Sequence, residues 1–321
     1  MTRIYPEVLV LSNKHDYSTD HVSFQLNRIG ASYLRLNRDQ LSEMQICLDP
    51  ISQKLSGKAK DFSFEILHEK LKSIYFRAPV YLRDNYQPGL SPNEQLSRSQ
   101  WAAFIRSLSV FDKALWLNYP QATYQAEIKP YQLHIANKLG FDVPKTSIAN
   151  SIGCQNIAHD KREKLIIKTL DPLVLSISDK EAFIYTNAIE LDDLSKADIS
   201  SAPIILQEAL IPKIDIRVTV IENIVFAVEI KKDSDGIDKD WRLEKDNVSY
   251  TSIILPSELE FKCITLVKEL GLKFGAIDLA LHNGKYYFLE INPTGEWAWL
   301  VSNTNLEIDK AIADILVRGN E

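Results

Sequence analysis

The 321-residue sequence has few cysteines, few glycines and no long hydrophobic run. Its three cysteines (Cys47, Cys154 and Cys263) lie far apart without a CxxC pair, which argues against a disulfide framework or a zinc site. No apolar stretch reaches transmembrane length, and the short apolar run near the start is too brief for a signal peptide. These absences predict a cytoplasmic protein that neither crosses nor anchors in a membrane.

The charge balance excludes a second group of functions. The chain carries 37 Lys and Arg against 43 Asp and Glu, giving a net charge of −6. An acidic total argues against a general affinity for nucleic acid or for anionic membranes. The six histidines are scattered, and no Ser-His-Asp or Cys-His arrangement suggests a nucleophilic enzyme.

Strand and helix patterns differ between the two halves of the chain. In the first third, "EVLVLSN", an amphipathic helix ending at Gly30 and "ASYLRLN" predict a βαβ unit. A boundary is expected near residues 118–128, followed by a helix from residue 129 that ends at Gly140. The second half predicts α+β structure with an antiparallel sheet, including a hairpin that turns at "EN" and a last hairpin that turns at "NG".

The last hairpin carries the sharpest polar cluster: Asp278, Glu290 and Asn292. Oxygen ligands of this kind suit Mg²⁺, and Glu290 and Asn292 share a face because they are two apart on a strand. Asp278 joins them only if the hairpin register allows it. A two-residue "NG" turn would place Asp278 opposite Leu289, whereas a three-residue loop that pairs Leu281 with Lys285 would put all three on one face. We predict the three-residue loop; a solvated face is the alternative.

At these residues the sequence resembles a known superfamily. The stretch "AIDLALHNGKYYFLEINPTGEWAWL" resembles the metal-binding end of ATP-grasp proteins, and its tail "NPTGEWAWL" is similar to the ATP-grasp peptide maturases of the microviridin or graspetide type. The resemblance covers nearly the whole chain. It implies an α/β and α+β ATP-grasp fold: an N-terminal pre-ATP-grasp domain over 1–122, a central lobe over 123–204 and a C-terminal lobe over 205–321, with ATP between the two lobes.

The resemblance also implies a nucleotide site. The magnesium ligands would be the three residues above, and Lys129 and Lys168 would hold phosphates, Lys129 beside the free amides of a helix start. Adenine would contact the backbone of a hinge formed by Gln207, Glu208, Ala209 and Leu210. For each lysine, the alternative is an ordinary solvated side chain.

Three further residues match the family pattern. Asp215 corresponds to the acid that binds ribose, and Arg217 and Arg242 to arginines near the reacting groups. On the alternation alone, the pattern favours a strand with Asp215 and Arg217 on an exposed face.

One departure follows from the scarcity of glycine. ATP-grasp proteins carry a glycine-rich loop over the phosphates after the second lysine, but residues 169–189 contain none. Serine hydroxyls such as Ser176 and Ser178 could substitute for it.

The implied activity is an ATP-dependent carboxylate ligase. It would activate Asp or Glu side chains of a ribosomally made precursor peptide as acyl phosphates, then join them to Thr or Ser hydroxyls or to Lys amines. The peptide would carry a leader segment, and a homodimer is compatible with the family. Trp297 and Trp299 are candidates for a substrate wall or for core packing. Two alternatives stay open: a ligase that adds glutamate-like residues to a protein tail or small acid, and a non-catalytic nucleotide-binding protein.

Overall fold

We describe the fold from a computed structural model that covers residues 2–77, 89–154, 157, 162–171, 174–177, 180–183, 187–232 and 248–320. Arg242 and Ser178 lie outside the described residues, as does the side chain of Ser176.

The predicted βαβ unit is present and builds the N-terminal sheet. Apolar strand β2 (Val8–Ser12) leads into α1 (Tyr17–Arg28), whose cap Asp16 accepts a hydrogen bond from the Thr19 N–H at 3.1 Å. Strand β3 (Tyr33–Asn37) then pairs in parallel with β2, and the sheet order is β3-β2-β7-β8, with β7 at Ser73–Phe76 and β8 at Leu115–Leu117.

A second, smaller sheet and several helices complete this part. The sheet has the order β1-β6-β5-β4, formed by Thr2–Ile4, Phe62–Leu67, Lys54–Lys58 and Gln45–Asp49. The helices are η1 (Arg38–Glu43), α2 (Pro92–Ser107) and η3 (Leu108–Val110). Ser91 and Glu94 form a capping box at the start of α2, which satisfies amides that the first turn leaves unpaired.

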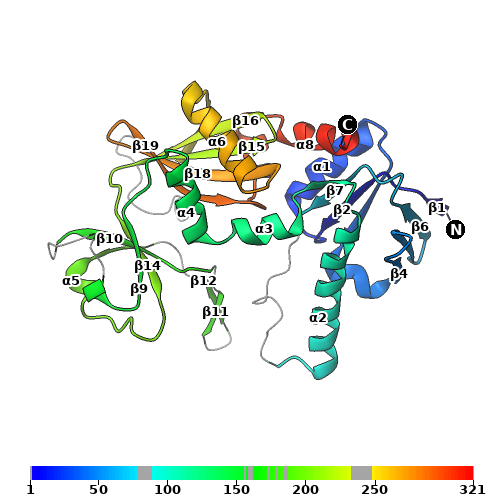
Figure 1. The fold of residues 1–321 in the computed structure, drawn as a ribbon, viewed down its shortest axis with the longest axis horizontal. Helices are drawn as coiled ribbons and strands as arrows, with labels where there is room; N and C mark the ends of the chain where they lie inside the picture. The colour runs from blue at the N-terminus through cyan, green and yellow to red at the C-terminus, as the bar shows by residue number, and fades with distance from the viewer. Residues whose placement is uncertain are drawn as a thin grey trace.

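The middle of the chain forms a four-stranded antiparallel sheet of order β13-β10-β14-β9. Its strands are β9 (Thr146–Ala149), β10 (Lys164–Lys168), β13 (Asn187–Glu190) and β14 (Ile204–Glu208). Hairpin β11 (Val174–Ile177) and β12 (Lys180–Phe183) and the short helices η4 (Ile152–Cys154) and α5 (Leu191–Leu194) accompany it. In Figure 1 this lobe lies at the lower left, below the sheet that contains β15 to β19.

The larger sheet is antiparallel, as predicted, with order β17-β16-β15-β18-β19. Its strands are β15 (Ile214–Ile221), β16 (Ile224–Lys232), β17 (Val248–Ile253), β18 (Phe274–His282) and β19 (Lys285–Asn292). Apolar side chains of α3 (Pro120–Ala126), α4 (Lys129–Lys138) and α6 (Ser257–Glu269) cover one face. The opposite face is therefore the one left for polar side chains of the sheet.

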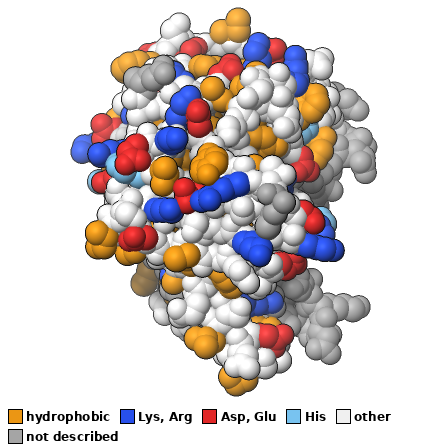
Figure 2. Space-filling view, turned by 90° about the vertical axis from the view of Figure 1, so that its right-hand side faces the viewer, with side chains coloured by type: hydrophobic (Ala, Val, Ile, Leu, Met, Phe, Trp, Pro, Cys, Tyr) orange, Lys and Arg blue, Asp and Glu red, His pale blue; other side chains and the backbone are white. Residues whose placement is uncertain are grey.

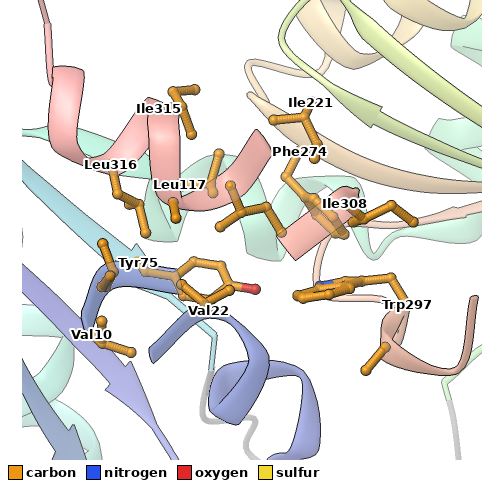
Figure 3. Packing of buried hydrophobic residues seen from close by; sticks show 14 of the residues in the cluster. Val10, Val22, Tyr75, Leu117, Ile221, Phe274, Trp297, Ile308, Ile315 and Leu316 are labelled. Atoms are coloured by element: carbon orange, nitrogen blue, oxygen red, sulfur yellow. The ribbon is translucent and has the colours of Figure 1, made fainter. Parts of the chain in front are cut away.

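The C-terminal helices return to the N-terminal sheet. After α7 (Ala298–Thr304), α8 (Ile308–Arg318) packs beside α1, and both chain termini lie at this end of Figure 1. Trp297 is fully buried in the hydrophobic core between the N-terminal sheet and the larger antiparallel sheet, where the Tyr75 ring points toward it (Figure 3). Trp299 is the second residue of α7 and packs on Tyr250 with ring centroids 5.2 Å apart. Core packing therefore accounts for Trp297.

The surface mixes charges of both signs. On the face drawn in Figure 2, Lys and Arg side chains are interspersed with Asp and Glu. Within the described ranges, none of the helices has both the length and the apolar character that a bilayer span requires.

The burial of Trp297 predicts a large stability effect. Replacing a buried tryptophan by alanine leaves a cavity, so Trp297→Ala is expected to lower the free energy of unfolding by about 3–5 kcal/mol. The partly buried Trp299→Ala is the control and should cost about 1 kcal/mol. Urea denaturation followed by circular dichroism measures both; equal effects would contradict the role assigned to Trp297.

Candidate active site

The last hairpin combines a tight turn with a β-bulge. Asn283 and Gly284 form a two-residue turn, both with positive φ, and His282 pairs with Lys285. The predicted three-residue loop is therefore wrong. Leu279 pairs with Phe288, but the preceding residue of β18, Asp278, pairs with Glu290, so Leu289 is an extra residue in β19.

The bulge restores the face that the loop was expected to provide. Without Leu289 as an extra residue, Asp278 would face Leu289, and Glu290 would turn toward the helix-covered face. With it, Asp278 lies directly opposite Glu290, and Asn292 shares their face two residues on. Asn292 Nδ2 lies 3.5 Å from Asp278 Oδ2. The bulge, rather than the predicted three-residue loop, thus brings the three predicted ligands together.

Strand β15 supplies a buried polar stripe beside them. Asp215 and Arg217 are 7% and 5% exposed, so the exposed face that the alternation favoured is wrong. The reason is that the segment after β19 folds over this face, with the Glu296 backbone oxygen accepting a bond from Arg217 Nη2 at 3.0 Å. Lys213, which was not among the predicted site residues, forms an ion pair with Asp215. Its place two residues before Asp215 in the alternating stretch "KIDIRVT" was the signal for it.

Arg217 is the central cation of the carboxylate cluster. Its Nη1 donates to both oxygens of Asp278, at 2.8 and 2.9 Å. Its buried Nε–H has no hydrogen-bond partner within the described residues, which marks a place for an acceptor atom of a ligand. Gly295 is required here because a Cβ would lie 2.9 Å from Arg217 Nη2 and 2.5 Å from the Ala276 Cβ.

Lys168 reaches toward the carboxylates from the central lobe. Burial lowers the pKa of its ammonium group; the charge of Glu290 raises this pKa, Lys129 and Lys213 lower it, and Asp278 raises it. Both predicted lysines and two predicted carboxylates are therefore electrostatic neighbours, although they come from different sheets and a helix. A site with several ammonium groups facing carboxylates suits a ligand with several negative charges.

The remaining predicted residues flank this cluster. Lys129 is the first residue of α4, and its Nζ donates to the Thr169 oxygen at 3.0 Å. Gln207 and Glu208 end β14, where Gln207 Nε2 donates to Thr146 Oγ1 and the Glu208 carboxylate accepts from the Lys145 N–H. The chain leaves the sheet at Ala209 and Leu210, so their backbone is no longer part of the strand ladder.

The N-terminal sheet contributes Arg77, which sequence analysis did not single out. Arg77 follows β7 and is 7% exposed; it bonds to Glu296 and to the Thr294 oxygen, and its Nε lies 3.2 Å from Asp16 Oδ2. Ser18 Oγ also donates to Glu296 at 2.6 Å. The acid of the "NPTGEW" segment thus anchors that segment to the N-terminal sheet.

The oxygen atoms of Asp278, Glu290 and Asn292 fit a magnesium ion whose remaining ligands come from a bound molecule. Across the described ranges, no group of three or more His, Cys, Asp and Glu side chains could hold a metal ion. Asp278, Glu290 and Asn292 instead offer two carboxylates and one amide oxygen on a common face. Mg²⁺ is commonly held by one or two carboxylates together with substrate phosphates, so these three side chains fit a Mg²⁺ ion that phosphates also bind.

Comparison with known proteins identifies the fold. No family model and no curated protein sequence matches the chain. A RiPP-associated ATP-grasp ligase from Chryseobacterium gregarium, in complex with ADP and a leader and core peptide, has a TM-score of 0.80 and 22% identity, covering 100% of this chain and 99% of its own. Macrocyclase MdnC from Microcystis aeruginosa MRC, bound with precursor peptide MdnA, has a TM-score of 0.79 and 22% identity, with 97% and 99% covered.

A third structure, ATP-grasp ligase PsnB complexed with a phosphomimetic variant of a minimal precursor, Mg and ADP, has a TM-score of 0.75 and 19% identity, covering 98% of each chain. The chain therefore has the ATP-grasp fold over its whole length, and the predicted fold class is confirmed.

The environment of Lys168 predicts a pH-dependent cost to folding. The pKa of Lys168 is lowered in the folded state, so its charged form destabilises the fold. This loss of unfolding free energy is complete at pH values below the folded-state pKa, and it disappears at pH values above the unfolded-state pKa of about 10.4. Lys168→Met is thus expected to stabilise the ligand-free protein at pH 7, with a gain that shrinks as pH rises toward 10. Urea unfolding of wild type, Lys168→Met and the control Lys164→Met, an exposed lysine on the same strand, measures this. A gain that grows with pH would contradict the assignment.

Proposed function

We propose that the protein is an ATP-dependent carboxylate ligase that cross-links side chains of a ribosomally made precursor peptide. The observation that carries the proposal is the shared face of Asp278, Glu290 and Asn292, with Lys168 approaching it from the central lobe. The fold supports it, because three proteins of this fold carry ligase or macrocyclase in their names and were solved with a peptide bound.

Each residue of the cluster has a chemical task in this proposal. Asp278, Glu290 and Asn292 would hold Mg²⁺, while Lys129 and Lys168 bind phosphate oxygens of ATP. Gln207 to Leu210 present backbone groups to the adenine edge, and Asp215 accepts from the ribose. Bound Mg²⁺ and ATP would supply charge neutralisation and the phosphoryl group that activates a carboxylate.

Arg217 has two tasks in the proposal. Its Nη1 keeps Asp278 oriented, and its unpartnered Nε–H is available to a developing negative charge. Arg242 is proposed as a second stabilising cation. The activated carboxylate, an acyl phosphate, loses phosphate when a Thr or Ser hydroxyl or a Lys amine attacks it, which gives an ester or an amide. These two reaction steps need no nucleophile from the enzyme.

The proposal extends to organisation and partners. It divides the chain at 1–122, 123–204 and 205–321, and takes as substrate a precursor peptide with a leader segment. A cytoplasmic location is part of the proposal, since the peptide is made by ribosomes and ATP is consumed. A homodimer is compatible with it.

Incubation with ATP, Mg²⁺ and a candidate precursor peptide, sought among short reading frames beside this gene, tests the activity by mass spectrometry. Loss of one water per bond, dependent on ATP, is expected. Modification only by free amino acids would favour a ligase acting on a protein tail or small acid. Nucleotide binding without turnover would favour a non-catalytic protein, which the glycine-free segment 169–189 would then explain.

The carboxylate pair yields a sharper prediction. Glu290→Gln keeps the shape of the side chain but removes its charge, so turnover should fall by about 100-fold or more while folding stays near normal. The control is Glu229→Gln on strand β16, which pairs with Ile216 on the other face of the sheet and should retain activity. Undiminished turnover in Glu290→Gln would remove Glu290 from the metal site.

A further inference from the structure

The outer edge of strand β19 is held by groups that are not a strand. β19 is the last strand of its sheet, so its outward backbone groups need partners from elsewhere. The Phe288 N–H donates to the Asp142 oxygen at 2.8 Å. At Ile291, Gln132 Oε1 accepts from the N–H at 3.0 Å and Gln132 Nε2 donates to the oxygen at 2.8 Å. The amide of Gln132 thus occupies the place of a neighbouring strand.

The contacts of Gln132 with Ile291 depend on the bulge. In a regular antiparallel strand, outward-pointing backbone groups recur at every second residue. Phe288 and Ile291 are three apart, and both point outward because Leu289 is an extra residue between them. In a strand without the bulge, Ile291 would turn both backbone groups toward β18. Gln132 therefore fits only the register that puts Glu290 opposite Asp278.

Gln132 is itself held in place. It is 3% exposed on α4, and its Nε2 also donates to the Ala126 oxygen at 2.5 Å. The same helix begins with Lys129, which the proposed function assigns to phosphate. One helix therefore carries a phosphate ligand and the side chain that fixes the strand of the metal ligands.

A second buried amide holds the other end of the segment. Asn118 Nδ2 donates to the oxygens of Phe274 and Pro293, both at 2.8 Å. Its Oδ1 accepts from the N–H groups of Lys273 and Phe274 at 2.8 and 2.9 Å. The start of β18 and the residue after Asn292 are thereby tied together, so the backbone is fixed on both sides of Asn292.

We propose that Gln132 is a positioning residue that holds β19 in its bulged register and so sets the affinity of the site for the divalent cation. The assignment of the cation site rests on the proposed function, whereas the register role rests on the hydrogen bonds of Gln132 alone. A methionine at this position fills similar volume but can neither accept from nor donate to Ile291.

Two measurements on the full chain test this. Hydrogen exchange of the ligand-free protein, read at peptides spanning 285–293, should be faster in Gln132→Met than in wild type. Binding of Mn²⁺ in the presence of ADP, followed by electron paramagnetic resonance, should weaken about 10–100-fold, as happens when groups that orient metal ligands are removed. Gln125→Met, an exposed glutamine on the neighbouring helix α3, is the control and should match wild type in both.

The outcomes separate the two claims. Unchanged exchange at 285–293 together with Mn²⁺ affinity within about twofold of wild type would overturn the role of Gln132. If Gln132→Met does not fold, Gln132→Glu keeps an oxygen that can accept from Ile291 but loses the donor to the Ile291 and Ala126 oxygens, and it should change both readouts in the same direction; no effect would equally overturn the role. If wild type itself binds no Mn²⁺ with ADP, the proposed function fails, and the exchange comparison alone decides the register role.

Discussion

The register of one edge strand decides whether Glu290 and Asn292 share a face with Asp278. Strand β19 leaves its turn in a register that would place Glu290 among the apolar side chains under α6, where a carboxylate is costly. Because Leu289 is an extra residue, Glu290 and the residues after it turn to the opposite face of the sheet from the one they would otherwise occupy. The regular pairing of β15 with β18 sets the contact between Arg217 and Asp278, and the bulge brings Glu290 and Asn292 onto the same face.

Electrostatics give the second level of organisation. The described site crowds cations and carboxylates into partly buried positions, and burial together with the neighbouring lysines lowers the pKa of Lys168. The ion pair of Arg77 with Glu296 has a different task, because it fastens the segment after β19 to the N-terminal sheet. Core residue Trp297 fixes the same segment from its apolar side.

Much of the fold was predictable because its signals are local. The βαβ unit, helix α4 and the "EN" hairpin follow from apolar periodicity and turn residues, and "NPTGEWAWL" carried the resemblance to ATP-grasp proteins. The bulge was not predictable, since the side chain that bonds to Ile291 in this register, Gln132, lies 159 residues earlier in the chain. The burial of Asp215 and Arg217 was missed for the same reason: alternation shows that a face is polar but not that a later segment covers it.

The most direct test of this account is the position of the metal. Crystals grown with ADP and Mn²⁺ can locate the ion by its anomalous scattering. The account predicts manganese between the nucleotide phosphates and the oxygens of Asp278, Glu290 and Asn292, with Leu289 as the extra residue of the bulge. Manganese bound elsewhere, or a β19 register in which Glu290 points toward α6, would contradict it.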